Sequence, residues 1–118
     1  MPYDFILARL LAQTDGAAGV LFLDDSGETV DLAVSDFTPF QMKVLGAYLG
    51  IHLRQLRRVL ESLGAGAPRE VHIERERAHV YAVPMNDGYA VALVQHRPGL
   101  SAVAQQNLHA AARELEQL

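Results

Sequence analysis

The fold is decided by one long apolar stretch, TPFQMKVLGAYLGIHLRQLRRVLESL, at residues 38–63. Thr38 is followed by Pro39 and then by Gln41, which is the pattern of a capping box with proline at the first helical position. The glycines and the proline of residues 64–68 are typical of a helix end. The stretch therefore predicts a helix over residues 39–63.

This predicted helix has more apolar surface than one core can cover. With about 100° between successive residues, its apolar arc spans roughly 200°, whereas a helix lying on one core needs about 100°. One side of the arc consists of Met42, Leu45, Leu49, Leu53, Leu56, Leu60 and Leu63. The next side consists of Phe40, Val44, Tyr48, Ile51 and Val59. We expect the leucine side to pack on the protein's own sheet and the second side to meet another protein chain.

Two further features of the helix each have more than one interpretation. Gly46 and Gly50 each cost the helix about 1 kcal/mol relative to alanine, and they indicate close approach of the sheet or of a partner helix, or tolerated variation. A basic stripe on the charged wedge is either a solvated face or a contact surface for an acidic partner. That stripe consists of Lys43, Arg54, Arg57 and Arg58.

Shorter elements are predicted on both sides of the long helix. Apolar runs and alternating segments bounded by turn residues predict five strands, at about residues 18–23, 28–34, 70–75, 78–85 and 89–95. A first helix is predicted at about residues 3–13, and Ser101 is in position to cap a last one. The apolar stripe of the last helix is Ala104, Leu108, Ala111, Ala112 and Leu115.

The strand at residues 70–75 is expected at an edge of the sheet, because the most apolar strands belong in the centre. A free edge invites pairing with another chain unless it is charged or covered. Glu74, Arg75, Glu76 and Arg77 supply such charges. The alternative is pairing with the same strand of a second copy, around a two-fold axis beside the long helix.

Composition narrows the possible functions. The chain has 118 residues, half of them apolar, which predicts one domain over residues 1–118 with a genuine core. It has no cysteine, so disulfides and thiolate chemistry are excluded, and its net charge of −4 gives no support to nucleic-acid binding. The N-terminal residues lack the basic start of a signal peptide, and no apolar run has membrane-spanning length, so we expect a cytoplasmic protein without membrane insertion.

No pattern of catalytic or metal-binding residues emerges. Gly27 at the sixth position of a calcium loop would put Phe22 and Ala33 at required carboxylate positions, so residues 24–28 indicate a polar turn instead. His72 and His79 could approach across a hairpin, but their parity along the strands predicts opposite faces unless a bulge intervenes. None of the serines lies in a nucleophile elbow. We assign no catalytic, cofactor-binding or metal-binding residue and expect no cofactor.

The order of elements and two local sequences resemble the Roadblock family of dynein-light-chain-like domains. The stretch GAAGVLFLDDSG at residues 16–27 is similar to the family's first strand and its turn. The segments EVHIE at residues 70–74 and VPMNDGYAVALV at residues 83–94 are similar to its closing meander. The resemblance implies an α+β fold of the profilin/Roadblock type, ordered αββαβββα. A five-stranded antiparallel sheet would have the long helix on one face and the N- and C-terminal helices on the other.

The same resemblance implies a non-catalytic homodimer that binds a small Ras-like GTPase and modulates its cycle, as in the bacterial Mgl-type regulators. Edge strands would pair into one sheet, with the long helices side by side. The expected dimer interface consists of Val44, Tyr48, Ile51, Gln55, Val59, Val71, His72, Ile73 and Glu74. The candidates for binding the GTPase are Lys43, Arg54, Arg57 and Arg58. An alternative is a small-ligand sensing or scaffolding domain of the longin, PAS or GAF type.

Overall fold

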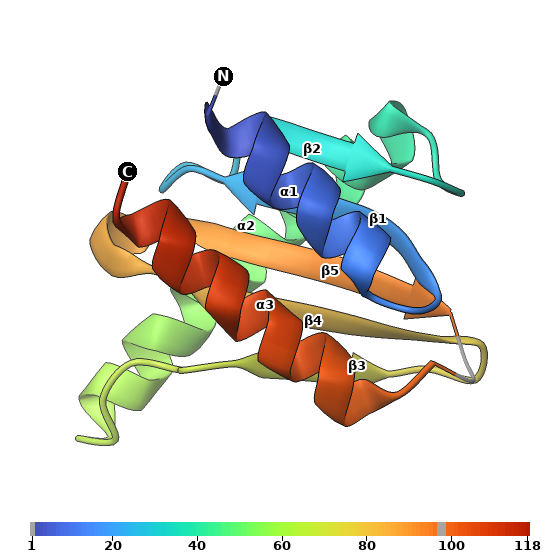
Figure 1. The fold of residues 1–118 in the computed structure, drawn as a ribbon. Coiled ribbons are helices and arrows are strands. Elements are labelled where there is room, and N and C mark those ends of the chain that lie inside the picture. The colour runs from blue at the N-terminus through green and yellow to red at the C-terminus, as the bar shows by residue number, and fades with distance from the viewer. Residues whose placement is uncertain (1, 97–98) are drawn as a thin grey trace.

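The computed structural model describes residues 2–96 and 99–118, and it shows an antiparallel sheet between two layers of helix (Figure 1). The helices are α1 (Pro2–Gln13), α2 (Pro39–Ser62) and α3 (Ser101–Glu116). The strands are β1 (Ala17–Leu23), β2 (Thr29–Val34), β3 (Val71–Glu74), β4 (Ala78–Pro84) and β5 (Ala90–His96), and the 3-10 turn η1 (Asn86–Gly88) joins β4 to β5. The order αββαβββα and the α+β fold class are confirmed.

The sheet has the strand order β2-β1-β5-β4-β3, with every neighbouring pair antiparallel. The two most apolar strands, β1 and β5, lie inside the sheet and are buried on both faces. β2 and β3 form the two edges, which confirms the edge position predicted for the strand after the long helix. That strand is shorter than predicted, because pairing with β4 covers residues 71–74 only.

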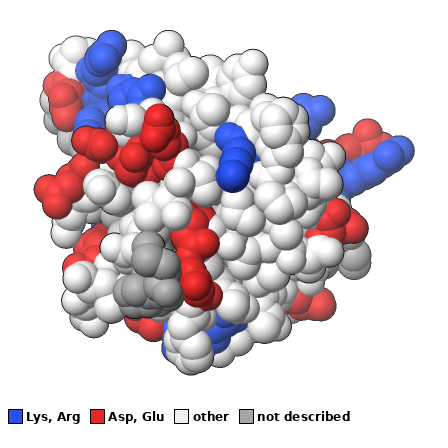
Figure 2. Space-filling view, turned by 90° about the horizontal axis from the view of Figure 1, so that it is seen from above, with Lys and Arg blue, Asp and Glu red and all other residues white. Residues whose placement is uncertain are grey.

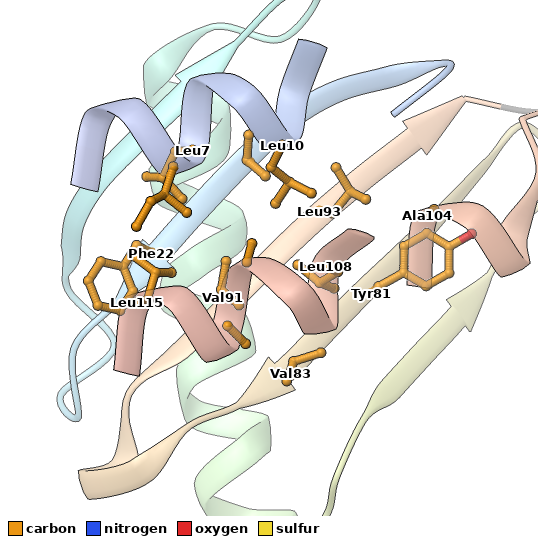
Figure 3. Close-up of a cluster of buried hydrophobic side chains, with 14 residues drawn as sticks. Leu7, Leu10, Phe22, Tyr81, Val83, Val91, Leu93, Ala104, Leu108 and Leu115 are labelled. Carbon is orange, nitrogen blue, oxygen red and sulfur yellow. The ribbon is translucent and has the colours of Figure 1, made fainter. Parts of the chain in front are cut away.

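The α1/α3 side of the sheet is closed by those two helices (Figure 1). Leu7 of α1, Leu108 of α3 and Leu93 of β5 are fully buried in the core that forms between them (Figure 3). The predicted apolar stripe of α3 is confirmed, since all five of its residues are buried. The predicted cap is wrong: Leu100 holds the N-cap position without a side-chain hydrogen bond, and Ser101 is already the first helical residue.

α2 begins as predicted. The Thr38 hydroxyl oxygen accepts a hydrogen bond from the Gln41 backbone N–H at 3.1 Å, and the Thr38 N–H donates to Gln41 Oε1 at 2.9 Å. These two bonds complete the capping box that the sequence predicts. The helix ends at Ser62, one residue before the predicted end, and Gly64 follows with a φ of 71°.

Gly46 and Gly50 let α2 lie close to the protein's own sheet and turn. A Cβ atom on Gly50 would lie 2.7 Å from the Cα of Gly27 in the β1–β2 turn. A Cβ atom on Gly46 would lie 2.6 Å from Leu21 Cδ2. Of the interpretations left open, close approach to the chain's own sheet is therefore confirmed.

The leucine side of α2 meets the sheet along only part of its length. Met42 and Leu49 are buried, and Leu45 and Leu53 are half-buried against the same cluster. The prediction is wrong for Leu56, which is 38% exposed, and for Leu63, which is 73% exposed, whereas Leu60 is half-buried. The reason is visible in Figure 1, where the C-terminal turns of α2 extend past the sheet and have no strand to pack on.

The β1–β2 connection is the polar turn that the sequence indicates. Asp24 Oδ1 accepts hydrogen bonds from the backbone N–H groups of Ser26 and Glu28, both at 2.9 Å. Those bonds fix the shape of the turn, and its Gly27 lies against Gly50 of α2.

Candidate protein–protein interface

An exposed apolar stripe runs along the side of α2 that faces away from the sheet. Because these residues recur every three or four positions, they lie on one side of the helix. Tyr48 is 61% exposed, Val59 54%, Ile51 42% and Val44 41%. Gln55 is also exposed on this side. We call Val44, Tyr48, Ile51, Gln55 and Val59 the outer stripe.

An apolar groove lies beside α2, over the part of the sheet that the helix leaves bare. α2 packs mainly on β1 and β2, and its C-terminal half passes the Pro84 end of β4, so the part of this face around Ala78 and Val80 is left uncovered. The groove has a volume of about 310 Å³. It is lined by Phe37, Gln41, Met42, Leu45, Ala78, Val80 and Val94.

The edge strand β3 borders this bare half of the sheet. Its register pairs Ile73 with Val80 and Val71 with Ala82, so these residues share the face of the groove. Ile73 is 40% exposed and Val71 is half-buried. The outer stripe, the groove and β3 thus bring together the apolar residues predicted for the dimer interface.

His72 and Glu74 lie on the opposite face of β3, and here the predicted parity is wrong. His72 Nε2 lies 2.9 Å from His79 Nδ1, so the two rings are in hydrogen-bond contact without a bulge. The register pairs His72 with Tyr81 and Glu74 with His79. The turn explains this, because a two-residue loop in an antiparallel hairpin brings residues of unlike parity onto the same face.

A polar cluster surrounds the two histidines, and the sequence reading did not identify it. The His72 and Tyr81 rings stack with centroids 4.6 Å apart, and the Tyr81 hydroxyl donates to Gln95 Oε1 at 2.8 Å. Glu70, just before β3, contacts His109 Nε2 at 2.6 Å. Counting the turn residues of the β3–β4 hairpin would have predicted the histidine pair, whereas the contact with α3 depends on the tertiary fold.

The predicted basic stripe is divided by the fold. Arg54 Nη1 donates to the backbone carbonyl of Asp25 at 3.3 Å, and Arg54 and Arg57 line one pocket together with the acidic β1–β2 turn. Lys43 and Arg58 are exposed instead. Of the four candidates for binding a partner, these two are the cations most open to solvent.

Charge and titration point to no other site among residues 2–96 and 99–118. In the view from above, small groups of positive and negative charge are separated by uncharged atoms (Figure 2). Burial raises the pKa of the Asp31 carboxyl on β2, and the neighbouring Asp4 carboxyl of α1 raises it further. The described residues contain no group of three or more His, Asp or Glu side chains arranged to hold a metal ion. Within the same ranges, no helix is both long and apolar enough to cross a membrane.

Comparison with known proteins places the fold. No protein-family model and no curated protein sequence matches this chain. Myxococcus xanthus MglB has a TM-score of 0.90 at 12% identity, over 99% of this chain and 94% of that one. A structure described as MglB with a tetrameric arrangement has a TM-score of 0.89 at 18% identity, over 98% of this chain and 86% of that one. A Roadblock/LC7 domain from Streptomyces avermitilis has a TM-score of 0.87 at 15% identity, over 97% and 94%. This chain therefore has the fold of Roadblock/LC7 domains and of MglB.

Proposed function

We propose that this chain is a non-catalytic dimeric adaptor that binds a small Ras-like GTPase and modulates its cycle. The observation that carries the proposal is the continuity of three uncovered features on one side: the outer stripe, the groove and the β3 edge. Monomeric proteins rarely leave an apolar surface of this kind open to water. The fold shared with MglB and the Roadblock/LC7 domain supports the same proposal.

A second copy of the chain would cover all three features at once. Antiparallel pairing of two β3 strands satisfies both free edges and joins the sheets. The bare half of each sheet then lies next to the bare half of the other, so the two α2 helices meet above them. Such a contact is self-complementary, as a two-fold interface must be. The structure described as a tetrameric arrangement of MglB is an assembly of the same fold.

The dimer is tested by charging the outer stripe and a matched position elsewhere. Ile51 on α2 and Val103 on α3 are both 42% exposed, so Ile51→Glu and Val103→Glu each place a negative charge at an equally exposed position. We expect sedimentation velocity to show a dimer for the native chain and for Val103→Glu, and a monomer for Ile51→Glu. A native chain that stays monomeric at high micromolar concentration would overturn the dimer.

The GTPase is assigned to the exposed basic residues of α2. Lys43 and Arg58 project from α2 beside the outer stripe and would meet an acidic surface on the GTPase. The experiment uses a purified Ras-like GTPase from the same genome, loaded with GDP or with a non-hydrolysable GTP analogue. We expect binding to differ between the two nucleotide states.

The charge contribution to GTPase binding has its own control. The double variant Lys43→Glu/Arg58→Glu should weaken binding, whereas Arg113→Glu, an exposed position on α3, should not. An equal loss of GTPase affinity in both variants would show that Lys43 and Arg58 do not belong to the GTPase-binding surface. Absence of binding in either nucleotide state would contradict the GTPase proposal while leaving the dimer intact.

A second candidate function, the sensing of a small apolar ligand, is favoured by the groove itself. Its volume of about 310 Å³ and its mostly apolar lining are within the range of small-molecule sites. The two candidates differ in what fills the groove. A fluorescent apolar probe that binds the Ile51→Glu variant and is displaced from the native chain on dimerisation would favour the adaptor. Retention of the probe in the dimer would favour the sensor.

A further inference from the structure

The histidine pair beside the β3 edge holds its shape only in certain protonation states. His72 Nε2 and His79 Nδ1 are 2.9 Å apart, which is a hydrogen-bond distance. A neutral imidazole has one N–H donor and one acceptor nitrogen, whereas a protonated imidazole has two donors. The contact is therefore possible while at least one ring is neutral, and it is lost when both rings carry a proton.

Burial makes the two rings unequal. His79 is 6% exposed, and its ring contacts the rings of both His72 and Tyr81 on the face covered by α3. His72 is exposed at the outer strand. When both rings are charged, His72 is the one that can turn away into solvent, because its neighbour is enclosed.

The titratable groups that face the pair come from β3, α3 and β4. On β3 the acidic neighbour is Glu74, which the register places opposite His79. On α3 the neighbour is His109, which contacts Glu70, and Gln105 also donates to that carboxylate at 2.6 Å. On β4 the neighbour is Tyr81, bound to Gln95 of β5.

The segment around the pair carries as many basic as acidic side chains. Residues 69–77 contain three arginines and three glutamates, and these charges cancel. Protonation of His72, His79 and His109 therefore leaves this edge of the molecule with a net positive charge.

A two-fold axis brings this edge against its own copy. β3 has only four residues, so an axis near its middle places the two His72 side chains close together along the joined strands. An axis perpendicular to the sheet keeps both of them on the same face. Like charges facing each other across paired strands destabilise the pairing.

We propose that the His72–His79 pair makes the β3–β3 contact between two copies of the chain sensitive to pH, so that acidification dissociates the dimer. This inference rests on the dimer proposed above and names its regulation. While at least one ring is neutral, the shared hydrogen bond keeps His72 against the sheet. Below about pH 6, where histidines take up protons, the bond breaks and charged His72 side chains from the two copies repel each other.

The test measures the dimer dissociation constant by sedimentation velocity at about pH 7.5 and about pH 5.5, at constant ionic strength. EDTA in all buffers removes any contribution from metal ions bound by the histidines. We expect the dissociation constant of the native chain to rise by about tenfold or more on acidification. An unchanged dissociation constant overturns the pH inference alone. A monomer at both pH values overturns the dimer and the inference together.

Two variants assign the effect to the pair. His72→Gln keeps a polar side chain but cannot titrate, so its dimer should lose most of the pH dependence. His96→Gln is the matched control, because His96 sits on the opposite face of the sheet, where it contacts Asp36 at 2.6 Å. Equal pH dependence in native chain, His72→Gln and His96→Gln would overturn the inference.

A measurement on the native chain guards against a variant that does not fold. Nitrogen-15 spectra of the histidine rings should show His72 and His79 taking up protons in two separate steps, as interacting sites do. Independent titration of the two rings with one common midpoint would overturn the proposed hydrogen-bonded pair.

Discussion

The two faces of the sheet differ in how completely helices cover them. Five strands about 4.8 Å apart make a sheet roughly 19 Å wide, whereas one helix with its side chains is about 10 Å across. α1 and α3 together span one face, which is closed over a fully buried core. α2 alone lies on the other face, over β1 and β2, and leaves the groove and β3 beside it. One face of the sheet is therefore closed within the chain, and the other leaves apolar surface that the proposed dimer would cover.

The largest expected effect comes from the closed face. Leu108 is fully buried between α3 and the sheet, so Leu108→Ala should lower the free energy of unfolding by about 2–5 kcal/mol. Val80 on the open face is only half-buried, and Val80→Ala should cost clearly less, about 1 kcal/mol. Urea denaturation at a concentration where the chain is monomeric measures both. Equal losses would mean that the open face is packed as tightly as the closed one.

The next effect tests how α2 is seated on its half of the open face. Gly50→Ala should destabilise the fold by about 1–3 kcal/mol despite the better helix propensity of alanine, because the new methyl group meets backbone 2.7 Å away. Gly46→Ala meets the ends of Leu21 and Leu23 side chains, which can move, and should cost less. Thermal unfolding of the two variants gives the comparison. A Gly50→Ala variant with the stability of the native chain would show that the β1–β2 turn shifts to accommodate the new methyl group.

A smaller effect is expected at the start of α2. Thr38→Ala removes the side-chain acceptor of the Gln41 N–H and should lower the free energy of unfolding by about 1 kcal/mol. The loss should be similar in monomer and dimer, because the cap holds the helix on its own sheet. Thr38→Ser, which retains the hydroxyl, is the matched control. A larger loss of unfolding free energy in the dimer than in the monomer would show that the cap and the neighbouring Phe37 contribute to the interface.

The smallest expected effect is a change in the pH profile of the closed face. Burial, and then Asp4, raise the pKa of Asp31 above its ordinary value of 3.8. The folded chain thus binds this proton more tightly than the unfolded chain, and stability is lost as pH rises through the window above 3.8. The melting temperature of Asp31→Asn minus that of the native chain should therefore increase as pH rises from about 4 to about 7.

The Asp31 result has a matched control in the exposed β4–β5 turn. Asp87→Asn removes a carboxylate of the same kind at a position that asparagine also tolerates, since its φ is 63°. Its melting temperature, relative to the native chain, should not change with pH in the same way. Parallel profiles for the two variants would show that the pH effect is one of net charge.

Much of the fold is predictable because its signals are local. The capping box at Thr38, the glycines after α2 and the apolar stripe of α3 are each contained within a few residues, and each is confirmed. The edge position of β3 follows from comparing the apolar content of the strands. The side assignment of Leu56 and Leu63 failed, because helical periodicity does not tell where the sheet underneath ends.

The candidate interface shows where sequence reasoning stops. A basic stripe is visible at Lys43, Arg54, Arg57 and Arg58, but which of these cations bind the chain's own turn depends on the distance between α2 and residues 24–28. The contact of His72 with His79 depends on the register of one hairpin. Such contacts join residues through loop lengths and packing, which periodicity does not encode.

The sequence by itself determined the elements, their order and the excess apolar surface of the long helix, because hydrophobic spacing, caps and turns act over short distances. Only the tertiary structure decided which part of that surface is left uncovered. One helix is narrower than five strands, so the position of α2 over β1 and β2 leaves the outer stripe, the groove and β3 together on one side. That arrangement supports the interface proposed above.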